Sequence, residues 1–218
     1  MLEASRILDM YSHDYRDEVI QANDNLRSCG IETVVAQGAW FEGGNVIRHF
    51  ASRTIFVGVY DAWTSEESAR KLLETINRTQ GEKWSLVTVP LKNYDTAYHL
   101  DLGMSEELPH GEVLLWPRVT DEETYKEIRN VVGHDNVIEV NDMDAKRMIT
   151  NMISIDDALI MTADGSAEVK GKLESLGYRL VLPGGYGQSS FEFGQGGVHC
   201  MTNDLPKLPK KQQVPCAP

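Results

Sequence analysis

Residues 68–89, SARKLLETINRTQGEKWSLVTV, combine an amphipathic helix, a break at Gly81 and a short strand rich in valine and leucine. The same order of features occurs three more times, in residues 18–35 (EVIQANDNLRSCGIETVV), 124–140 (TYKEIRNVVGHDNVIEV) and 167–183 (AEVKGKLESLGYRLVLP). The break glycines recur at intervals of about 45 to 50 residues, within the range of repeated supersecondary units; they are Gly30, Gly81, Gly133 and Gly177. The sequence therefore predicts a repeated α/β unit.

Pairs of short strands are predicted between these helices from runs of β-branched and aromatic residues. The pairs are residues 40–48 with 54–60, 97–103 with 111–117, and 150–155 with 158–162, and residues 189–202 hold the opening strands of a last unit. Each unit then reads strand, strand, helix, strand. This order favours α/β layers around an axis, with the helices outside and the strands inside. An open α/β sheet with coincidental spacing is the alternative.

Charge and composition exclude several classes of function. The 218-residue chain has a formal charge of −12 and a pI near 4.9, with no cluster of Lys and Arg, so no nucleic-acid partner is expected. No secretory signal and no run of about 18 apolar residues is present, which predicts a cytoplasmic protein without a membrane partner. The cysteines are Cys29, Cys200 and Cys216. Because their spacing fits no zinc pattern, neither a structural metal nor a disulfide framework is expected, and Cys29 and Cys216 are interpreted as buried small residues or as exposed idle thiols.

Unusual polar residues occupy equivalent positions in the repeat, on the predicted opening strand that follows each closing strand. They are Glu42, His99 with Asp101, and Cys200. Equivalent positions in a ring face the same axis, so we expect these side chains to point into one central cavity. His99 and Asp101 are two residues apart and would share one face of a strand. Taken singly, each has a plainer interpretation as a turn residue, a structural histidine or a buried thiol.

Three segments carry a resemblance to a known family: FEGGNV (41–46), YHLDLG (98–103) and GGVHCMTNDLP (196–206). Together they resemble signature segments of the guanidine-modifying superfamily, which includes arginine deiminases, dimethylargininases, agmatine and peptidylarginine deiminases, and amidinotransferases. The resemblance runs from about Arg16 to Pro206 and implies an α/β propeller of five ββαβ modules around a pseudo-five-fold axis. By this resemblance, residues 1–206 form one catalytic domain with about four of the five modules, incomplete at the N-terminus, and residues 207–218 form a Lys/Pro/Gln-rich tail.

The resemblance also implies a chemistry for the polar residues. Cys200 would be the nucleophile, His99 the general acid and base, Glu42 the group that orients His99, and Asp101 a carboxylate that grips the guanidinium. The implied activity is hydrolysis of a guanidino compound through a covalent thiouronium intermediate on Cys200, without a metal or an organic cofactor. Two alternatives remain: an amidinotransferase with the same residues, and a non-catalytic member that binds a ligand or a protein partner.

The sequence departs from the family pattern near the predicted site. Asn45 stands where the family usually carries an aspartate, and Gln195 and His199 stand where members that bind free arginine often place arginines. We expect Asn45, Gly197 and His199 to join Asp101 in binding the substrate, with Gly197 letting the backbone pass close to it.

A further departure concerns the start of the chain. The family's Phe-x-Arg-Asp segment is not found before Glu42, and SHDYRDE (12–18) is a poor substitute because it falls in a predicted helix. The expected consequence is a ring with two uncovered sheet edges. A homo-oligomer, or a separate chain that supplies the missing module, would cover them.

Overall fold

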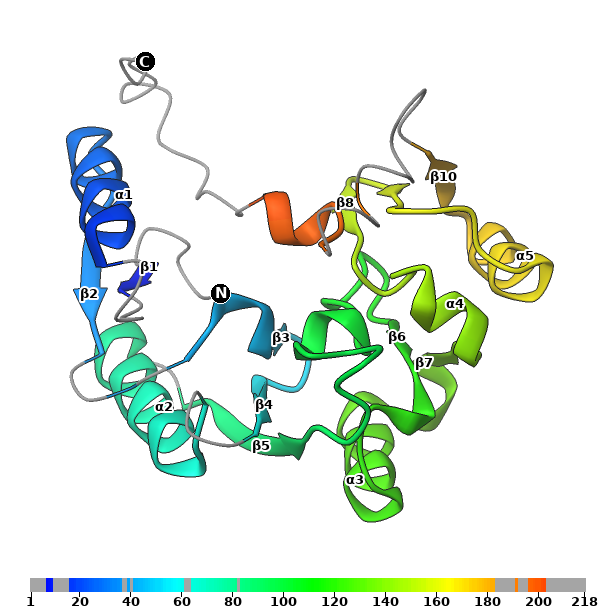
Figure 1. Ribbon diagram of the computed structural model, residues 1–218, viewed down its shortest axis with the longest axis horizontal. Helices are drawn as coiled ribbons and strands as arrows, with labels where there is room; N and C mark the ends of the chain where they lie inside the picture. Colours follow the sequence, from blue (N-terminus) through cyan, green and yellow to red (C-terminus); the bar gives the residue numbers. More distant parts are fainter. Residues whose placement is uncertain are drawn as a thin grey trace.

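A computed structural model describes residues 7–9, 16–36, 39, 41–60, 64–81, 83–182, 191 and 196–202. In Figure 1 the helices lie along the outside of an arc and the strands along its inside, as the sequence predicts. No helix among the described residues is long and apolar enough to cross a membrane.

Four parallel strand pairs, each connected through one helix, make up the repeat. They are β1 (Ile7–Asp9) and β2 (Thr33–Val35) with α1 (Arg16–Ser28); β4 (Thr54–Val59) and β5 (Ser85–Pro90) with α2 (Glu66–Gln80); β6 (Val113–Leu115) and β7 (Val137–Glu139) with α3 (Glu122–Val132); and β9 (Ala158–Ile160) and β10 (Arg179–Val181) with α5 (Ala167–Ser175). These pairs contain all four repeats found in the sequence. The repeated unit is therefore confirmed.

Opening strands complete two of the units. They are β3 (Val46–His49), antiparallel to β4, and β8 (Ile153–Ile155), antiparallel to β9. In the unit of β6 an isolated antiparallel bridge between Met104 and Leu115 takes the place of the opening strand. A short helix that the sequence pattern did not predict, α4 (Asp142–Lys146), follows β7.

The recurring glycines and the capping residues explain where the helices begin and end. Ser65, Asp121 and Ser166 accept a hydrogen bond from a backbone N–H of the first turn of α2, α3 and α5, a common N-terminal cap. The break glycines all have positive φ, in the range from 68° to 96°, a conformation that glycine adopts at no steric cost. The glycine spacing in the sequence is therefore the spacing of helix ends.

Two hydrophobic clusters hold the units together. The larger one contains Phe56, Leu100 and Leu115 from three different segments, and the smaller one packs Leu72 of α2 against Trp84. Leu100 is fully buried and is the neighbour of both His99 and Asp101, so core packing fixes the backbone on which these two polar residues stand.

The predicted strand positions of the polar residues are wrong. Three 3-10 turns lie at or directly after these positions: η1 (Gly43–Asn45), η2 (Leu100–Leu102) and η5 (His199–Met201). In η2 the N–H of Leu102 donates to the carbonyl of His99, which closes a turn in place of a ladder between strands. Within residues 97–103 and the described part of 189–202, the chain thus forms turns where strands were expected.

Candidate active site

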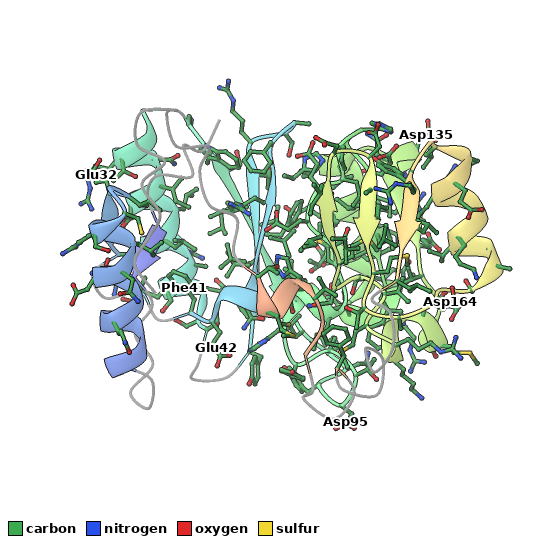
Figure 2. All side chains as sticks on the ribbon, turned by 90° about the horizontal axis from the view of Figure 1, so that it is seen from above. Glu32, Phe41, Glu42, Asp95, Asp135 and Asp164 are labelled. Carbon is green, nitrogen blue, oxygen red and sulfur yellow. The ribbon has the colours of Figure 1, made fainter. Side chains whose placement is uncertain are left out.

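The three turns bring the predicted site residues together. Glu42 directly precedes η1, His99 directly precedes η2, Asp101 lies within η2, and Cys200 lies within η5. Figure 2 shows Glu42 on the same side of the molecule as the orange segment η5.

Gly44 marks the point where these residues meet. A Cβ atom at Gly44 would lie 2.8 Å from Nδ1 of His99 and 3.1 Å from each carboxylate oxygen of Asp101. The sulfur of Cys200 is 3.4 Å from Oδ2 of the same carboxylate. The side chains of His99 and Asp101 therefore lie close together, as expected. The turn η2 brings them together, and not the two-residue period of a strand.

His99 is bound to a carboxylate on its other side. Its Nε2 lies 2.7 Å from Oε2 of Glu42, and the two side chains are 22 % and 35 % exposed. The ring of Tyr98 packs against the ring of His99 at 4.7 Å between centroids. A carboxylate at this distance fixes the orientation of the imidazole ring.

Asp101 is a buried carboxylate with one oxygen free among the described residues. The residue is 1 % exposed, and its Oδ1 has no hydrogen-bond partner in the part of the chain that the structure describes. Thr150 donates its hydroxyl to the backbone carbonyl of Asp101 and fixes the turn. Because buried polar atoms are almost always paired, this oxygen has the character of an acceptor for a bound N–H donor.

The thiol of Cys200 is neutral at neutral pH in this arrangement. Cys200 is exposed as a residue, but its sulfur rests on Asp101. Burial of the sulfur, followed by the negative charge of Asp101, raises the pKa of Cys200 to about 11. Burial, followed by the charges of Cys200, Asp101 and Glu42, also raises the pKa of Tyr98.

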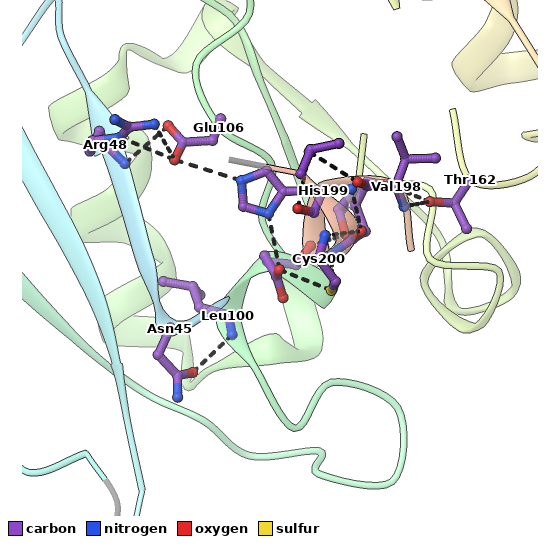
Figure 3. A network of polar contacts seen from close by, with 12 residues as sticks. Asn45, Arg48, Leu100, Glu106, Thr162, Val198, His199 and Cys200 are labelled. Carbon is purple, nitrogen blue, oxygen red and sulfur yellow. Dashed lines mark hydrogen bonds and ion pairs between the residues drawn. The ribbon is translucent and has the colours of Figure 1, made fainter. Parts of the chain in front are cut away.

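His199 lies between two carboxylates. Its Nδ1 is 3.1 Å from Oδ2 of Asp101 and its Nε2 is 3.9 Å from Oε1 of Glu106, which in turn pairs with Arg48 at 3.3 Å (Figure 3). Burial alone would lower the pKa of His199, but the hydrogen bond and charge of Asp101, with the charge of Glu106, raise it above its ordinary value. His199 therefore serves as an internal counter-ion to Asp101.

Glu106 and Asn151 were missed by the sequence analysis. Burial raises the pKa of Glu106, against the lowering effect of Arg48 and His199. Asn151 contacts Cys200 directly, with Nδ2 3.1 Å from the sulfur. A signal for Asn151 was present, because it lies between the closing strand β7 and the opening strand β8, as Glu42 lies between β2 and β3. Glu106 had no comparable signal.

Two residues predicted to bind substrate, Asn45 and Gly197, make contacts within the framework. Asn45 is fully buried, accepts the N–H of Leu100 at 3.1 Å and donates to Thr64 at 3.4 Å, so its side chain ties η1 to η2. At Gly197 a Cβ would lie 2.3 Å from both Oδ1 of Asn151 and the Thr162 hydroxyl. Glycine is required there by these two side chains of the protein.

The remaining sequence predictions have mixed outcomes. Cys29 is disulfide-bonded, so its interpretation as a free thiol is wrong. Cys216, Gln195 and residues 12–15 also lie outside the described residues. Within the described part of the chain, no group of three or more His, Cys, Asp and Glu side chains is arranged to hold a metal ion.

Comparison with known proteins gives similarity at the level of the fold. No protein-family model and no curated protein matches the sequence. The N-terminal domain of ArgZ bound to product, "an arginine dihydrolase from the Ornithine-Ammonia Cycle in Cyanobacteria", aligns with a TM-score of 0.78 and 21 % identity over 94 % of this chain and 72 % of that domain.

Two further structures extend the comparison. A variant of the ArgZ domain with a covalently bound reaction intermediate aligns with a TM-score of 0.78 and 21 % identity, over 94 % of this chain and 73 % of that one. A dimethylarginine dimethylaminohydrolase, solved as an adduct with 4-chloro-2-hydroxymethylpyridine, aligns with a TM-score of 0.65 and 24 % identity, over 90 % of this chain and 71 % of that one.

Proposed function

We propose that this chain, whose fold is that of the guanidine-modifying superfamily, is a cysteine-dependent hydrolase of a guanidino compound. The observation that carries the proposal is the contact of the Cys200 sulfur with a buried carboxylate, Asp101, whose second oxygen has no partner among the described residues. The proposed nucleophile would thus lie beside a carboxylate oxygen that can accept hydrogen bonds from a cation.

Binding depends on charge. A guanidinium group has a pKa above ~12 and arrives as a cation, and its transfer out of water is favourable only where carboxylates pair with it. Asp101 would accept its N–H groups at Oδ1. The bound cation would also offset the negative charge beside Cys200, which lowers the pKa of the thiol and allows the thiolate to form.

The first half-reaction forms the covalent intermediate. The Cys200 thiolate attacks the central guanidinium carbon and forms a C–S bond, and one C–N bond breaks as the imidazolium of His99 gives its proton to the departing amine. Glu42, at 2.7 Å from His99, would stabilise the imidazolium that this step consumes. The product on the protein is an S-alkylthiouronium.

The second half-reaction regenerates the protein. Neutral His99 takes a proton from a water molecule, whose oxygen attacks the same carbon, and the C–S bond breaks to return the Cys200 thiolate. The second proton of the attacking water passes to solvent as the C=O bond forms, the neutral ureido product leaves, and His99 is again protonated. Such proton transfers are typically worth ~10² to 10⁴ in rate.

The test is a substrate panel with a matched variant. The protein is incubated with arginine, agmatine, methylated arginines and an arginine peptide, each with and without glycine, and ureido product and mass adducts on Cys200 are measured. Ureido product that is lost in Cys200→Ala supports the hydrolase. A new guanidino compound formed only with glycine would assign the same residues to an amidinotransferase, and no product with any substrate would refute the proposal.

A further inference from the structure

The side chain of Asn151 makes three hydrogen bonds to the segment that carries Cys200. Its Oδ1 accepts the backbone N–H groups of His199 at 2.9 Å and of Cys200 at 3.3 Å. Its Nδ2 donates to the sulfur of Cys200 at 3.1 Å. The side chain is fully buried, so solvent does not compete for these hydrogen bonds.

The orientation of the Asn151 amide is fixed by its partners. Only the oxygen of an amide can accept two backbone N–H groups, so the NH₂ group must face the sulfur. Thr162 holds the same segment in place. Its hydroxyl donates to the backbone carbonyl of Asn151 at 2.5 Å and accepts the backbone N–H of Val198 at 3.0 Å. Figure 3 shows Thr162 and Val198 beside Cys200.

We propose that Asn151 is a catalytic residue that donates its Nδ2 hydrogen bond to the Cys200 thiolate, while its Oδ1 holds η5 in the reactive position. The inference rests on the proposed nucleophilic role of Cys200. A hydrogen bond to a charged acceptor is stronger than one to a neutral acceptor, so this contact favours the thiolate over the thiol. Asn151 acts against Asp101, which disfavours the thiolate in the absence of a cation.

Asn151→Asp separates the two tasks of the side chain. Aspartate keeps the shape and one oxygen that accepts the two backbone N–H groups, but it turns a carboxylate oxygen toward the sulfur. We expect the pKa of Cys200 to rise by about one unit or more, because a donor is replaced by a negative charge. Since the remaining thiolate becomes somewhat more nucleophilic, alkylation at pH 8 should slow by about threefold for each unit.

Two other variants supply the controls. Asn151→Ala removes the donor to the sulfur, and the acceptor with it, without adding a charge, so it should also slow alkylation if aspartate prevents folding. Thr162→Val removes the support of the segment without touching the sulfur. It should lower the melting temperature and leave the alkylation rate within about twofold of the wild type.

The experiment measures iodoacetamide modification of Cys200 by peptide mass spectrometry between pH 7 and 10, beside circular dichroism of each variant. Slower alkylation in both folded Asn151 variants, with Thr162→Val unchanged, supports the inference. Unchanged alkylation in both Asn151 variants, or an equal loss in Thr162→Val, would overturn it. Alkylation needs no turnover, so a wild type without activity would sink the proposed function while this result still decided the role of Asn151.

Discussion

Replacing Asp101 by asparagine should make the Cys200 thiol more acidic and at the same time remove turnover. Burial of the sulfur, the first cause of the raised pKa, stays the same in this variant. The second cause, the negative charge of Asp101, is removed. A thiol that reacts faster with an alkylating agent but no longer reacts with substrate would separate the two effects of this carboxylate.

The expected size follows from the 3.4 Å between the sulfur and Oδ2. Two unit charges at this distance interact by about 1 kcal/mol with the screening of water and by about 5 kcal/mol at an effective dielectric constant of about 20. Because Cys200 is exposed and His199 loses the carboxylate that favours its own charge, the lower figure applies. One pKa unit corresponds to about 1.4 kcal/mol, so the pKa of Cys200 should fall by about one unit.

Two assays check the prediction. Iodoacetamide modification of Cys200 at pH 8 should become about threefold faster than in the wild type. Turnover of the best substrate should fall by about 100-fold or more, since loss of one partner from a buried charge pair typically costs about 3–5 kcal/mol.

The control is Asp157→Asn, an exposed carboxylate paired with His110, which should change neither quantity. Slower alkylation in Asp101→Asn, or full turnover, would refute the reasoning.

Three further substitutions test the framework. Gly44→Ala should reduce kcat/KM with little change in melting temperature, because its Cβ would meet His99 at 2.8 Å. The control is Gly171→Ala in α5, whose Cβ meets nothing within 4 Å; it should stabilise the fold by about 0.5–1 kcal/mol. Asn45→Ala should lower the free energy of unfolding by about 1–3 kcal/mol, measured by urea denaturation, because it leaves a buried backbone N–H unpaired. His199→Gln should flatten the pH dependence of the melting temperature. Because the pKa of His199 is raised, its ion pair stabilises the fold fully below about pH 6.5 and is lost as the pH rises through the raised value. An unchanged pH dependence in the variant would contradict the pairing.

The repeat was predictable because its signals are local. Helix amphipathicity, the glycine at each helix end and the apolar strand that follows all lie within about 20 residues of sequence, as in residues 68–89. The turns η2 and η5 were not predictable in the same way. In η2 the apolar residues alternate with polar ones as in a strand, and the burial of Leu100 in a core shared by several units decides that this segment turns.

The candidate site was predictable only where position in the repeat carried information. Glu42, His99, Asp101 and Cys200 each follow the closing strand of a unit, and Asn151 also follows one, β7, so position in the repeat pointed to Asn151 as well. Glu106 has no such place. Its contacts with His199 and Arg48 depend on how three segments that are distant in the sequence pack together. The spacing of residues along the chain does not predict a contact of this kind.

The charges around Cys200 argue for a thiol that stays unreactive until a cation arrives. Asp101 and Glu106 are offset by His199 and Arg48, but Oδ1 of Asp101 is left without a partner among the described residues. A guanidinium at that oxygen would supply the positive charge that the thiolate lacks, so one ligand would complete the ion pair and activate the nucleophile. A neutral urea, the expected product, offers no such charge. The same carboxylate would therefore favour binding of the substrate, formation of the thiolate and release of the product.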